Sequence, residues 1–471
     1  MLKKTKIVAT ISDARCDVEF IRQLFDAGMN VVRLNTAHQN LDQAKKVINN
    51  VRVVSERIAI LIDTKGPEIR TSSNGVAFKV TEGTQVLVKG NPSGESCEGC
   101  LYVSYEGIVN EVPVGSSLLI DDGDIELSVV DKMFDALVCK TVNHGTIKNR
   151  KSVNIPNVRI NLPSVSDKDR QFVKFAIDNK VDFIAHSFVR NSNDVKEIKA
   201  LIDEHNSPIK IIAKIENQEG VDNIDEILDH TYGIMVARGD LGIEIPAERI
   251  PVIQRKIVKK CIEAKKPVII ATQMLHTMIE NPRPTRAEVS DIANAIYQRT
   301  DAIMLSGETA YGQYPLESVQ LMTRVAQEIE RVLDPDVNTN IVRINNEITA
   351  TLARSAVRAC TSLPIKAIVV DSLTGRTGRY LAAFRGKIPV YAICYRENVM
   401  RELALSYGVQ AEYMEPRDSR DGFLSHTITH MVSQGRITLD DMVLVIGGSF
   451  GPSNGASFME ISKASALVVN K

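Results

Sequence analysis

The chain has 471 residues, of which 44% are hydrophobic and 24% are charged, as expected for a globular protein of about two to four domains. Its 57 Lys and Arg side chains nearly balance 58 Asp and Glu side chains, so the formal net charge is -1. Nucleic acids and anionic membrane surfaces attract proteins with a basic excess, so this balance argues against both kinds of partner.

The N-terminus contains lysines, but its apolar run stops at Asp13 and no small-residue cleavage site follows, so we expect no secretory signal. No segment approaches the ~18 consecutive apolar residues that span a bilayer. The seven cysteines are mostly isolated within apolar segments. Buried reduced thiols in the cytoplasm are the simplest interpretation of this pattern.

Eight β-branched or apolar runs alternate with helical patterns such as residues 193–204, 249–265, 286–299 and 316–333. The runs are residues 6–11, 30–35, 58–63, 182–188, 210–216, 233–238, 267–272 and 301–306. This alternation predicts parallel βα units, and eight of them predict a TIM (β/α)8 barrel. We assign residues 1–70 and 161–335 to this barrel.

Two further regions depart from this pattern. Residues 71–160 are alternating and turn-rich, which predicts an inserted all-β lid domain at the rim of the barrel. Cys97 and Cys100 form a CxxC there, but no second Cys pair or His pair completes a zinc site, so we interpret it as a loop feature. Residues 345–471 resume the alternation, with strands in AIVV, PVYAIC, DMVLVIGG and ALVV, and predict a C-terminal three-layer α/β domain.

Polar residues gather where the barrel strands end. TIM-barrel active sites lie at the C-terminal ends of the strands, so their convergence on one rim predicts a site. The residues concerned are Arg33, Asn35, Asp63, Thr64, Lys65, Glu68, Ser187, Lys214, Glu216, Arg238, Asp240, Thr272 and Glu308.

Lys214, Glu216 and Asp240 form the centre of the predicted site. Alternation along a strand points Lys214 and Glu216 to the same side. Glu216 and Asp240 offer hard oxygen ligands for Mg²⁺ or Mn²⁺, with water and substrate oxygens completing the shell. A structural salt bridge is the alternative, but it leaves Arg33, Asp63 and Thr272 unexplained. Phosphoryl transfer fits a divalent ion beside Lys and Arg, although glycine-rich phosphate-binding motifs are absent.

Long motifs in this chain resemble pyruvate kinase over nearly the whole sequence. They are DTKGPEIR at 63–70, KIENQEG at 214–220, MVARGDLGIEIP at 235–246, PVIIATQML at 267–275, NPRPTRAEVSDIANA at 281–295 and DAIMLSGETAYGQYP at 301–315. The resemblance implies transfer of the phosphoryl group of phosphoenolpyruvate to ADP, giving pyruvate and ATP, with Mg²⁺ and K⁺. It also implies a cytoplasmic homotetramer.

The resemblance further implies a role for each matching residue. Catalysis would fall to Lys214, Thr272 and Arg33, and substrate binding to Arg33, Ser187, Lys214, Gly239, Asp240 and Thr272. Nucleotide binding would involve His38, Arg70, Lys151 and Asn35. Glu216 and Asp240 would hold Mg²⁺, and Asn35, Asp63 and Thr64 would hold K⁺. A sugar-phosphate effector would lie at Ser372, Thr374, Gly375, Arg376 and Thr377, although an N-capped helix explains that segment equally well.

Departures from the family pattern concern the cation and nucleotide sites. Ala37 stands where the family has a serine hydroxyl that binds potassium, and Asp13 stands where it has a proline near the nucleotide base. We therefore expect an active enzyme with an altered potassium response. Two other hypotheses stay open at this point: a catalytically inactive regulatory homologue that binds phosphoenolpyruvate or nucleotide, and a Mg²⁺-dependent barrel lyase or aldolase acting on pyruvate-like acids.

Overall fold

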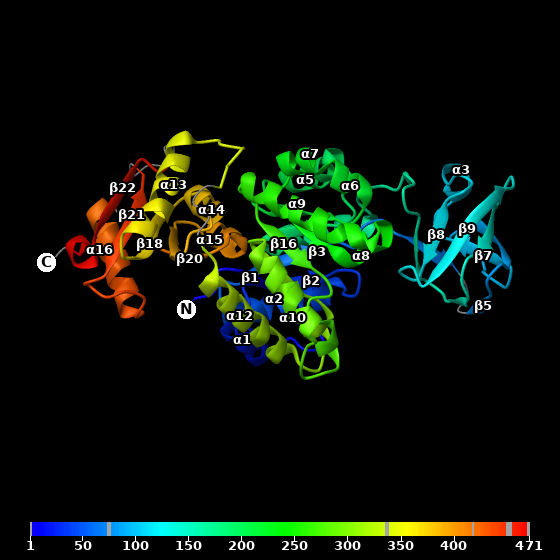
Figure 1. The fold of residues 1–471 in the computed structure, drawn as a ribbon, viewed down its shortest axis with the longest axis horizontal. Coiled ribbons are helices and arrows are strands. Elements are labelled where there is room, and N and C mark those ends of the chain that lie inside the picture. The colour runs from blue at the N-terminus through cyan, green and yellow to red at the C-terminus, as the bar shows by residue number, and fades with distance from the viewer. Residues whose placement is uncertain (1, 73–76, 335–338, 417–418, 449–454, 469–471) are drawn as a thin grey trace.

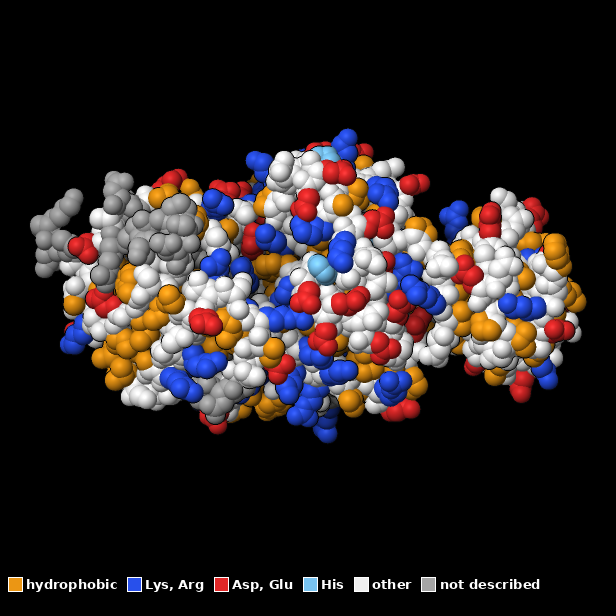
Figure 2. Space-filling model, turned by 90° about the horizontal axis from the view of Figure 1, so that it is seen from above, with side chains coloured by type: hydrophobic (Ala, Val, Ile, Leu, Met, Phe, Trp, Pro, Cys, Tyr) orange, Lys and Arg blue, Asp and Glu red, His pale blue; other side chains and the backbone are white. Residues whose placement is uncertain are grey.

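The computed structural model describes the chain except residues 1, 73–76, 335–338, 417–418, 449–454 and 469–471. Three units lie along its long axis (Figure 1). The central barrel lies between a C-terminal α/β unit and a small β unit. Figure 2 shows that the β unit is joined to the barrel through a narrow waist, and that charges of both signs are interspersed on the visible face.

The central unit is a closed eight-stranded parallel barrel, as the sequence predicted. Its order is β1-β17-β16-β15-β14-β13-β3-β2. The strands are β1 Lys6–Thr10, β2 Val31–Asn35, β3 Ala59–Asp63, β13 Phe183–His186, β14 Lys210–Ile215, β15 Gly233–Ala237, β16 Val268–Ala271 and β17 Ala302–Leu305. Each predicted run contains one of these strands. Because all eight run in parallel, the polar residues at their C-terminal ends meet at a single rim.

Helices cover the outside of the barrel (Figure 1). The principal ones are α1 Val18–Asp26, α2 Leu41–Val54, α4 Asp167–Asp178, α5 Ser192–Asp203, α7 Ile224–His230, α9 Ile250–Glu263, α10 Arg286–Tyr297 and α12 Pro315–Val332. Several begin with side-chain caps: Asn40, Ser166 and Thr285 each accept a bond from the backbone three residues on, which satisfies an N–H group that the helix itself leaves unpaired. The strands' outward side chains and the helices' apolar faces form one large core.

The inserted unit is a second closed barrel, of seven strands in the order β10-β6-β7-β4-β12-β8-β9. Its strands are β4 Ile69–Ser72, β6 Gln85–Gly90, β7 Cys100–Val103, β8 Ser117–Ile120, β9 Ile125–Lys132, β10 Leu137–Thr141 and β12 Ser152–Asn154, with the pair β5 Phe78–Val80 and β11 Gly145–Ile147 beside them and the short helix α3 Ile108–Glu111. The first and last strands of this unit pair with each other, Ser152 opposite Arg70. Its two chain crossings therefore lie side by side at the polar rim.

The C-terminal unit is a five-stranded sheet between helices. Its order is β20-β19-β18-β21-β22, with β18 Ile365–Ser372, β19 Val390–Cys394, β20 Val409–Tyr413, β21 Met442–Gly447 and β22 Phe458–Lys463. Helices α13 Glu347–Ser362 and α14 Arg376–Ala383 pack on one face, and α16 Arg420–Ser433 packs on the other. One sequence prediction is wrong over its described part: in ALVV (466–469), Ala466 and Leu467 belong to a 3-10 turn, Ala464–Leu467, after β22, and residue 469 lies outside the described residues.

Buried charges join the C-terminal unit to the N-terminal face of the barrel. Arg385 makes two bonds of 2.7 Å to the carboxylate of Asp301, the residue before β17. Arg401 donates to Asp182, the residue before β13, at 2.6 Å. This contact is therefore on the face of the barrel opposite the polar rim. Among the described residues, no helix is long and apolar enough to cross a membrane.

Candidate active site at the barrel rim

Lys214 lies at the centre of a compact polar cluster. Its Nζ lies 2.8 Å from Glu216 Oε1 and 3.1 Å from Asp63 Oδ1, and it donates to Ser187 Oγ at 2.7 Å. The strand alternation that sends Lys214 and Glu216 to one side is thus confirmed by a direct contact. Burial disfavours the ammonium ion, but the nearby carboxylates outweigh it and raise the pKa of Lys214. The lysine is a permanent cation at the rim.

Arg33 is the second buried cation of the cluster. Its Nε lies 2.6 Å from Asp63 Oδ2, and one terminal nitrogen donates to Thr10 Oγ1 at 2.9 Å. Asp63 therefore binds Arg33 through one oxygen and contacts Lys214 through the other. Burial opposes ionisation of Asp63, but Arg33 and Lys214 more than compensate and lower the pKa of that carboxyl. One carboxylate thus binds both buried cations of the cluster.

Glu216 and Asp240 form the predicted metal pair. Glu216 is 1% exposed, and its Oε2 accepts from the Phe188 N–H at 2.7 Å. Its Oε1 is buried and has no hydrogen-bond geometry to any described donor, although Lys214 is close. Burial and the negative charge of Asp240 raise the pKa of Glu216 against the opposing effect of Lys214. A buried carboxylate oxygen without a hydrogen bond, beside a second carboxylate, suits a hard divalent cation.

No group of three or more His, Cys, Asp or Glu side chains that could hold a metal occurs among the described residues. Two carboxylates fit Mg²⁺ nonetheless, because this ion keeps several waters and takes further oxygens from substrate phosphates.

The loop after β16 holds Thr272 in a strained conformation. Thr272 has φ of +68°, a left-handed value that is costly for a β-branched residue. Its hydroxyl accepts from the Gly239 N–H at 2.8 Å and donates to Ala271 O at 2.7 Å. Arg238 donates to the Thr272 carbonyl at 2.7 Å. The strain is thus maintained by contacts that bring Thr272 next to Gly239, in the first turn of α8 Arg238–Glu244.

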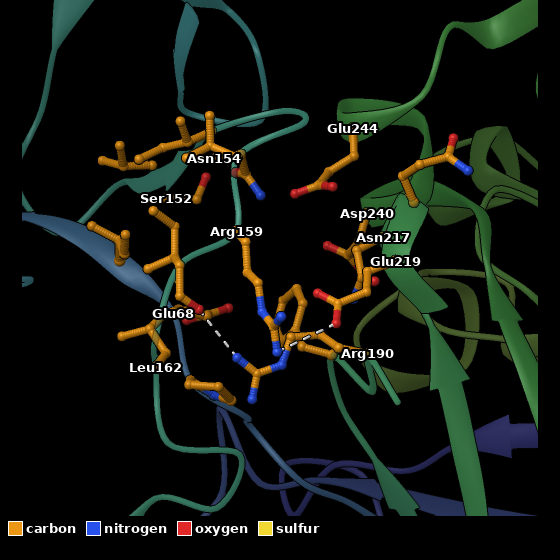
Figure 3. A pocket seen from close by; sticks show the side chains of 18 of the residues that line it. Glu68, Ser152, Asn154, Arg159, Leu162, Arg190, Asn217, Glu219, Asp240 and Glu244 are labelled. Carbon is orange, nitrogen blue, oxygen red and sulfur yellow. Dashed lines mark hydrogen bonds and ion pairs between the residues drawn. The ribbon is translucent and has the colours of Figure 1, made fainter. Parts of the chain in front are cut away.

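A cavity of about 730 Å³ separates the lid from the barrel. Figure 3 shows Ser152 and Asn154 on the lid side facing Asp240 and Glu244 on the barrel side. Arg70 and Lys151, the predicted nucleotide contacts, line this cavity together with Asp240.

Arg70 and Lys151 each form an ion pair with a nearby carboxylate. Arg70 binds Glu68, with Nε donating at 2.8 Å, and Lys151 binds Asp121 at 2.8 Å. Both side chains are about one-third exposed, so these contacts leave them accessible to an anionic ligand from the cavity.

The predicted potassium ligands lie together but are already engaged. Asn35 Oδ1 accepts from the Ala37 N–H at 3.1 Å, and the Thr64 carbonyl accepts from Ser187 Oγ at 2.7 Å. The oxygens of Asp63 contact two cations, as described above. His38 is exposed, and its backbone N–H donates to Asn35 O at 3.2 Å. The potassium ligand set therefore contains fewer free oxygens than its residue types suggest.

The predicted effector segment lies in the C-terminal unit, away from the rim. Ser372 ends β18, and its Oγ accepts from the Gly375 N–H at 3.0 Å. Gly375 has φ of +72° at the start of α14, where a left-handed turn favours glycine. Thr374 lies in this turn, and Arg376 and Thr377 are the first two residues of α14. The loop of residues 447–457, which follows β21, lies partly outside the described residues.

Sequence reasoning missed several residues of the site. Thr10 fixes Arg33, and the shared role of Asp63 was not anticipated, because a strand-end aspartate carries no sign of which cation it binds. Arg159 lines the cavity from a loop, and Glu244 lines it from the end of helix α8 Arg238–Glu244. Glu244 lies within the motif at 235–246, but the motif did not mark it as a site residue. Its raised pKa, about 7, follows from burial against the lid side of the cavity, which depends on how the chain folds.

Comparisons with known proteins agree over the whole chain. Family models described as "Pyruvate kinase, barrel domain" and "Pyruvate kinase, alpha/beta domain" match residues 2–319 and 350–462. A pyruvate kinase of Borreliella burgdorferi is 49% identical over 465 residues, covering 98% of this chain and 97% of that protein. One of Geobacillus stearothermophilus is 42% identical over 99% of this chain and 81% of that protein. A crystal structure of a pyruvate kinase from Cryptosporidium parvum superposes with a TM-score of 0.93 at 36% identity, over 98% of this chain and 96% of that one.

Proposed function

The chain belongs to the pyruvate kinase family and transfers the phosphoryl group of phosphoenolpyruvate to ADP, and we propose that the cluster around Lys214 performs this transfer. The observation that carries the proposal is the arrangement of Lys214 and Arg33 on the two oxygens of Asp63. Two fixed cations at the barrel mouth stabilise negative charge that develops on a moving phosphoryl group, with no reorganisation during the reaction. The comparisons give no support to a catalytically inactive homologue.

Lys214 and Arg33 have distinct roles in the proposed reaction. Lys214 contacts the transferring phosphoryl group and stabilises the enolate left behind. Arg33 binds the phosphate through the guanidinium donors that Asp63 and Thr10 leave free. Ser187, which accepts from Lys214, orients the ammonium group. Thr272 lies next to the Gly239–Asp240 turn, where its hydroxyl faces the carbon that takes up a proton.

Glu216 and Asp240 are the proposed ligands of Mg²⁺ or Mn²⁺. The buried Oε1 of Glu216, which lacks hydrogen-bond geometry, supports this assignment. When bound, the divalent ion supplies charge neutralisation and polarises the phosphoryl and enolate oxygens. On the opposite side of the cavity, Arg70 and Lys151 bind the phosphates of ADP; their position on paired lid strands supports this role.

Three further proposals rest on the resemblance. K⁺ binds at Asn35, Asp63 and Thr64, with a weakened response because Ala37 supplies no hydroxyl. His38 and Asn35 lie near the nucleotide. A phosphate-bearing effector binds the turn from Ser372 to Thr377. We also propose a homotetramer in a reducing, cytoplasmic compartment, which suits the buried free thiols.

The proposed function is tested by following pyruvate in a mixture of the protein with phosphoenolpyruvate, ADP, Mg²⁺ and K⁺. We expect turnover that requires all three of phosphoenolpyruvate, ADP and Mg²⁺. Lys214→Met should lower kcat by about 10²- to 10³-fold. Lys199→Met, which removes an exposed lysine paired with Asp203 on α5, is the matched control and should leave kcat unchanged. Wild-type protein without ADP-dependent pyruvate would contradict the activity, and full activity of Lys214→Met would contradict the site.

A further inference from the structure

Cys97 and Cys100 lie opposite each other in a tight hairpin of the lid. The Cys97 N–H donates to Cys100 O at 2.9 Å, and the Cys100 N–H donates to Cys97 O at 3.0 Å. Glu98 and Gly99 form the two-residue turn, in which Gly99 has φ of +80°, a value that glycine adopts without strain. The two cysteines are therefore a hydrogen-bonded pair of an antiparallel ladder.

This pairing brings the two thiols to disulfide range. Residues of a hydrogen-bonded pair have Cα atoms about 5.5 Å apart, within the ~4.4–6.8 Å that a disulfide spans. Directly opposed side chains also point to the same face, with Cβ atoms about 4.5–5.5 Å apart. A disulfide needs about 3.8 Å between Cβ atoms, so the hairpin must tighten by about 1 Å. Such a bond can form, but its strain makes it easy to reduce.

These two thiols are also accessible. Cys97 is exposed and Cys100 is half-buried. Four other cysteines are buried, and burial raises the pKa of Cys139 and Cys394 to about 12, so these remain protonated and unreactive. The buried ones are Cys16, Cys139, Cys261 and Cys394. Cys360 is half-buried but has no neighbouring cysteine in its helix α13.

The surroundings of Cys100 place its sulfur on the outer face of the lid. Leu101 and Val103 of β7 point into the lid core, so Cys100 and Tyr102 point outward. The Tyr102 side chain hydrogen-bonds with Cys100, and the Lys89 ammonium is close to both. The Ser96 hydroxyl accepts from the Tyr102 N–H at 2.9 Å and fixes the incoming chain beside β7. A small oxidant can therefore reach the pair from solvent.

We propose that Cys97 and Cys100 form a reversible dithiol–disulfide site that is oxidised by peroxides and reduced by small or protein dithiols. The Cys97 thiol releases its proton and the thiolate attacks one oxygen of hydrogen peroxide; the O–O bond breaks, Cys97 becomes a sulfenic acid, and the other oxygen takes up the released proton and leaves as water. The Cys100 sulfur then attacks the Cys97 sulfur, the S–O bond breaks, and a second water carries away the Cys100 proton. The two sulfurs give up two electrons to the peroxide. A dithiol reverses the change and becomes a disulfide itself.

The test uses the full-length protein, reduced and then treated with hydrogen peroxide under native conditions. Remaining thiols are alkylated, and the products are identified by intact mass and peptide mapping. Wild type should lose two alkylatable thiols per chain, yield a Cys97–Cys100 disulfide peptide, and recover both thiols with dithiothreitol. Cys97→Ser and Cys100→Ser should form no such bond, whereas Cys360→Ser should behave as wild type.

A second measurement tests the proximity of the reduced thiols without oxidation. Phenylarsine oxide binds two neighbouring thiols together, so reduced wild type and Cys360→Ser should each retain one arsenical per chain, and either hairpin variant should retain none. Unchanged alkylation after peroxide would overturn the proposal. So would a disulfide mapped to another cysteine, or conversion of Cys97 to a sulfinic acid while Cys100 stays alkylatable.

Discussion

The two faces of the barrel both bury charged side chains, but they use them differently. On the N-terminal face, both oxygens of Asp301 are bound: each accepts from Arg385, and the Tyr407 and Val268 N–H groups donate to them at 3.1 and 3.2 Å. On the C-terminal face, Glu216 Oε1 has only the nearby Lys214 and no aligned hydrogen bond.

This difference in bonding distinguishes a carboxylate that holds the C-terminal unit against the barrel from a carboxylate that can bind a ligand. A buried carboxylate whose partners are complete has nothing left to offer a ligand, so the Asp301 pair holds the C-terminal unit in place. Glu216 Oε1, by contrast, has the Lys214 ammonium beside it but no aligned hydrogen bond, and we propose that a divalent cation completes its contacts. A buried carboxylate therefore stabilises the fold at the N-terminal end of one barrel strand, and in the proposed mechanism another prepares a cation site at the C-terminal end of a different strand.

The largest expected effect is on the docking face. Asp301→Asn leaves the Arg385 guanidinium buried without its countercharge, and should lower the free energy of unfolding by about 3–5 kcal/mol. The kcat of the folded fraction should stay close to wild type, because Asp301 is at the far end of β17 from the rim. Urea denaturation measures the change in the free energy of unfolding, and a steady-state assay at low temperature measures kcat. A large loss of kcat with unchanged stability would break the comparison.

Glu216→Gln makes the same chemical change on the catalytic face and should have the opposite outcome. We expect kcat to fall by about 10²- to 10³-fold, equivalent to about 3–4 kcal/mol, because a neutral amide is a poor Mg²⁺ ligand. Stability should not fall, since burial already disfavours the charged form of Glu216. The Mg²⁺ dependence of the rate and urea denaturation of the same preparation are the measurements. Destabilisation comparable with that of Asp301→Asn would show that both faces are merely structural.

His186 is the last residue of β13, in the wall of the barrel directly before Ser187. It is fully buried, neither ring nitrogen has a hydrogen-bond partner within the described part of the chain, and burial lowers its pKa to about 4. The His186 ring therefore binds a proton more weakly in the folded state than in the unfolded state, in which the pKa of histidine is about 6.5.

Keeping His186 neutral contributes fully to the free energy of unfolding above about pH 6.5. This contribution is lost as the pH falls toward about 4, and it amounts to at most about 3 kcal/mol. His186→Gln should flatten that part of the wild-type stability profile, measured by urea denaturation at several pH values. Replacing the exposed His205 by Gln is the control and should leave the profile unchanged. An identical slope in His186→Gln and wild type would contradict this assignment.

The strain at Thr272 provides a smaller test. Thr272→Gly should raise the free energy of unfolding by about 1 kcal/mol, because glycine adopts the left-handed conformation without steric cost. It should also lower kcat, since it removes the hydroxyl that we propose lies near the reacting carbon. Lys180→Gly, at another left-handed position far from the rim, should leave kcat unchanged. A more stable variant with full activity would remove Thr272 from the proposed mechanism.

The smallest expected effect concerns potassium. Ala37→Ser restores one hydroxyl beside Asn35 and should lower the half-saturating K⁺ concentration by roughly fivefold, equivalent to about 1 kcal/mol for one added oxygen contact. Initial rates are followed during titration with KCl at constant ionic strength. A family-like saturation curve for wild type, unchanged in Ala37→Ser, would contradict the altered potassium response.

The barrel was predictable because its signal is repeated. The buried parallel strands β1 and β16 contain the apolar runs Ile7–Ala9 and Ile269–Ala271, which are visible in the sequence. Alternation along β14 places Lys214 and Glu216 on one side. The strand prediction for ALVV was wrong over its described part, because the hydropathy of so short an apolar run does not distinguish a strand from a 3-10 turn. The pairing of Asp63 with both Arg33 and Lys214 also lay beyond sequence reasoning, since it depends on side-chain rotamers across three strands.

The pairing of β4 with β12 has a consequence for folding. Strands β3 and β13 are hydrogen-bonded neighbours, Leu61 opposite Phe183, although the whole lid separates them in sequence. Closing so long a loop costs entropy and slows the search for contacts. A lid that folds first, with Arg70 opposite Ser152, holds its own ends together and shortens the effective loop. The insertion would then assist the assembly of the barrel that it interrupts.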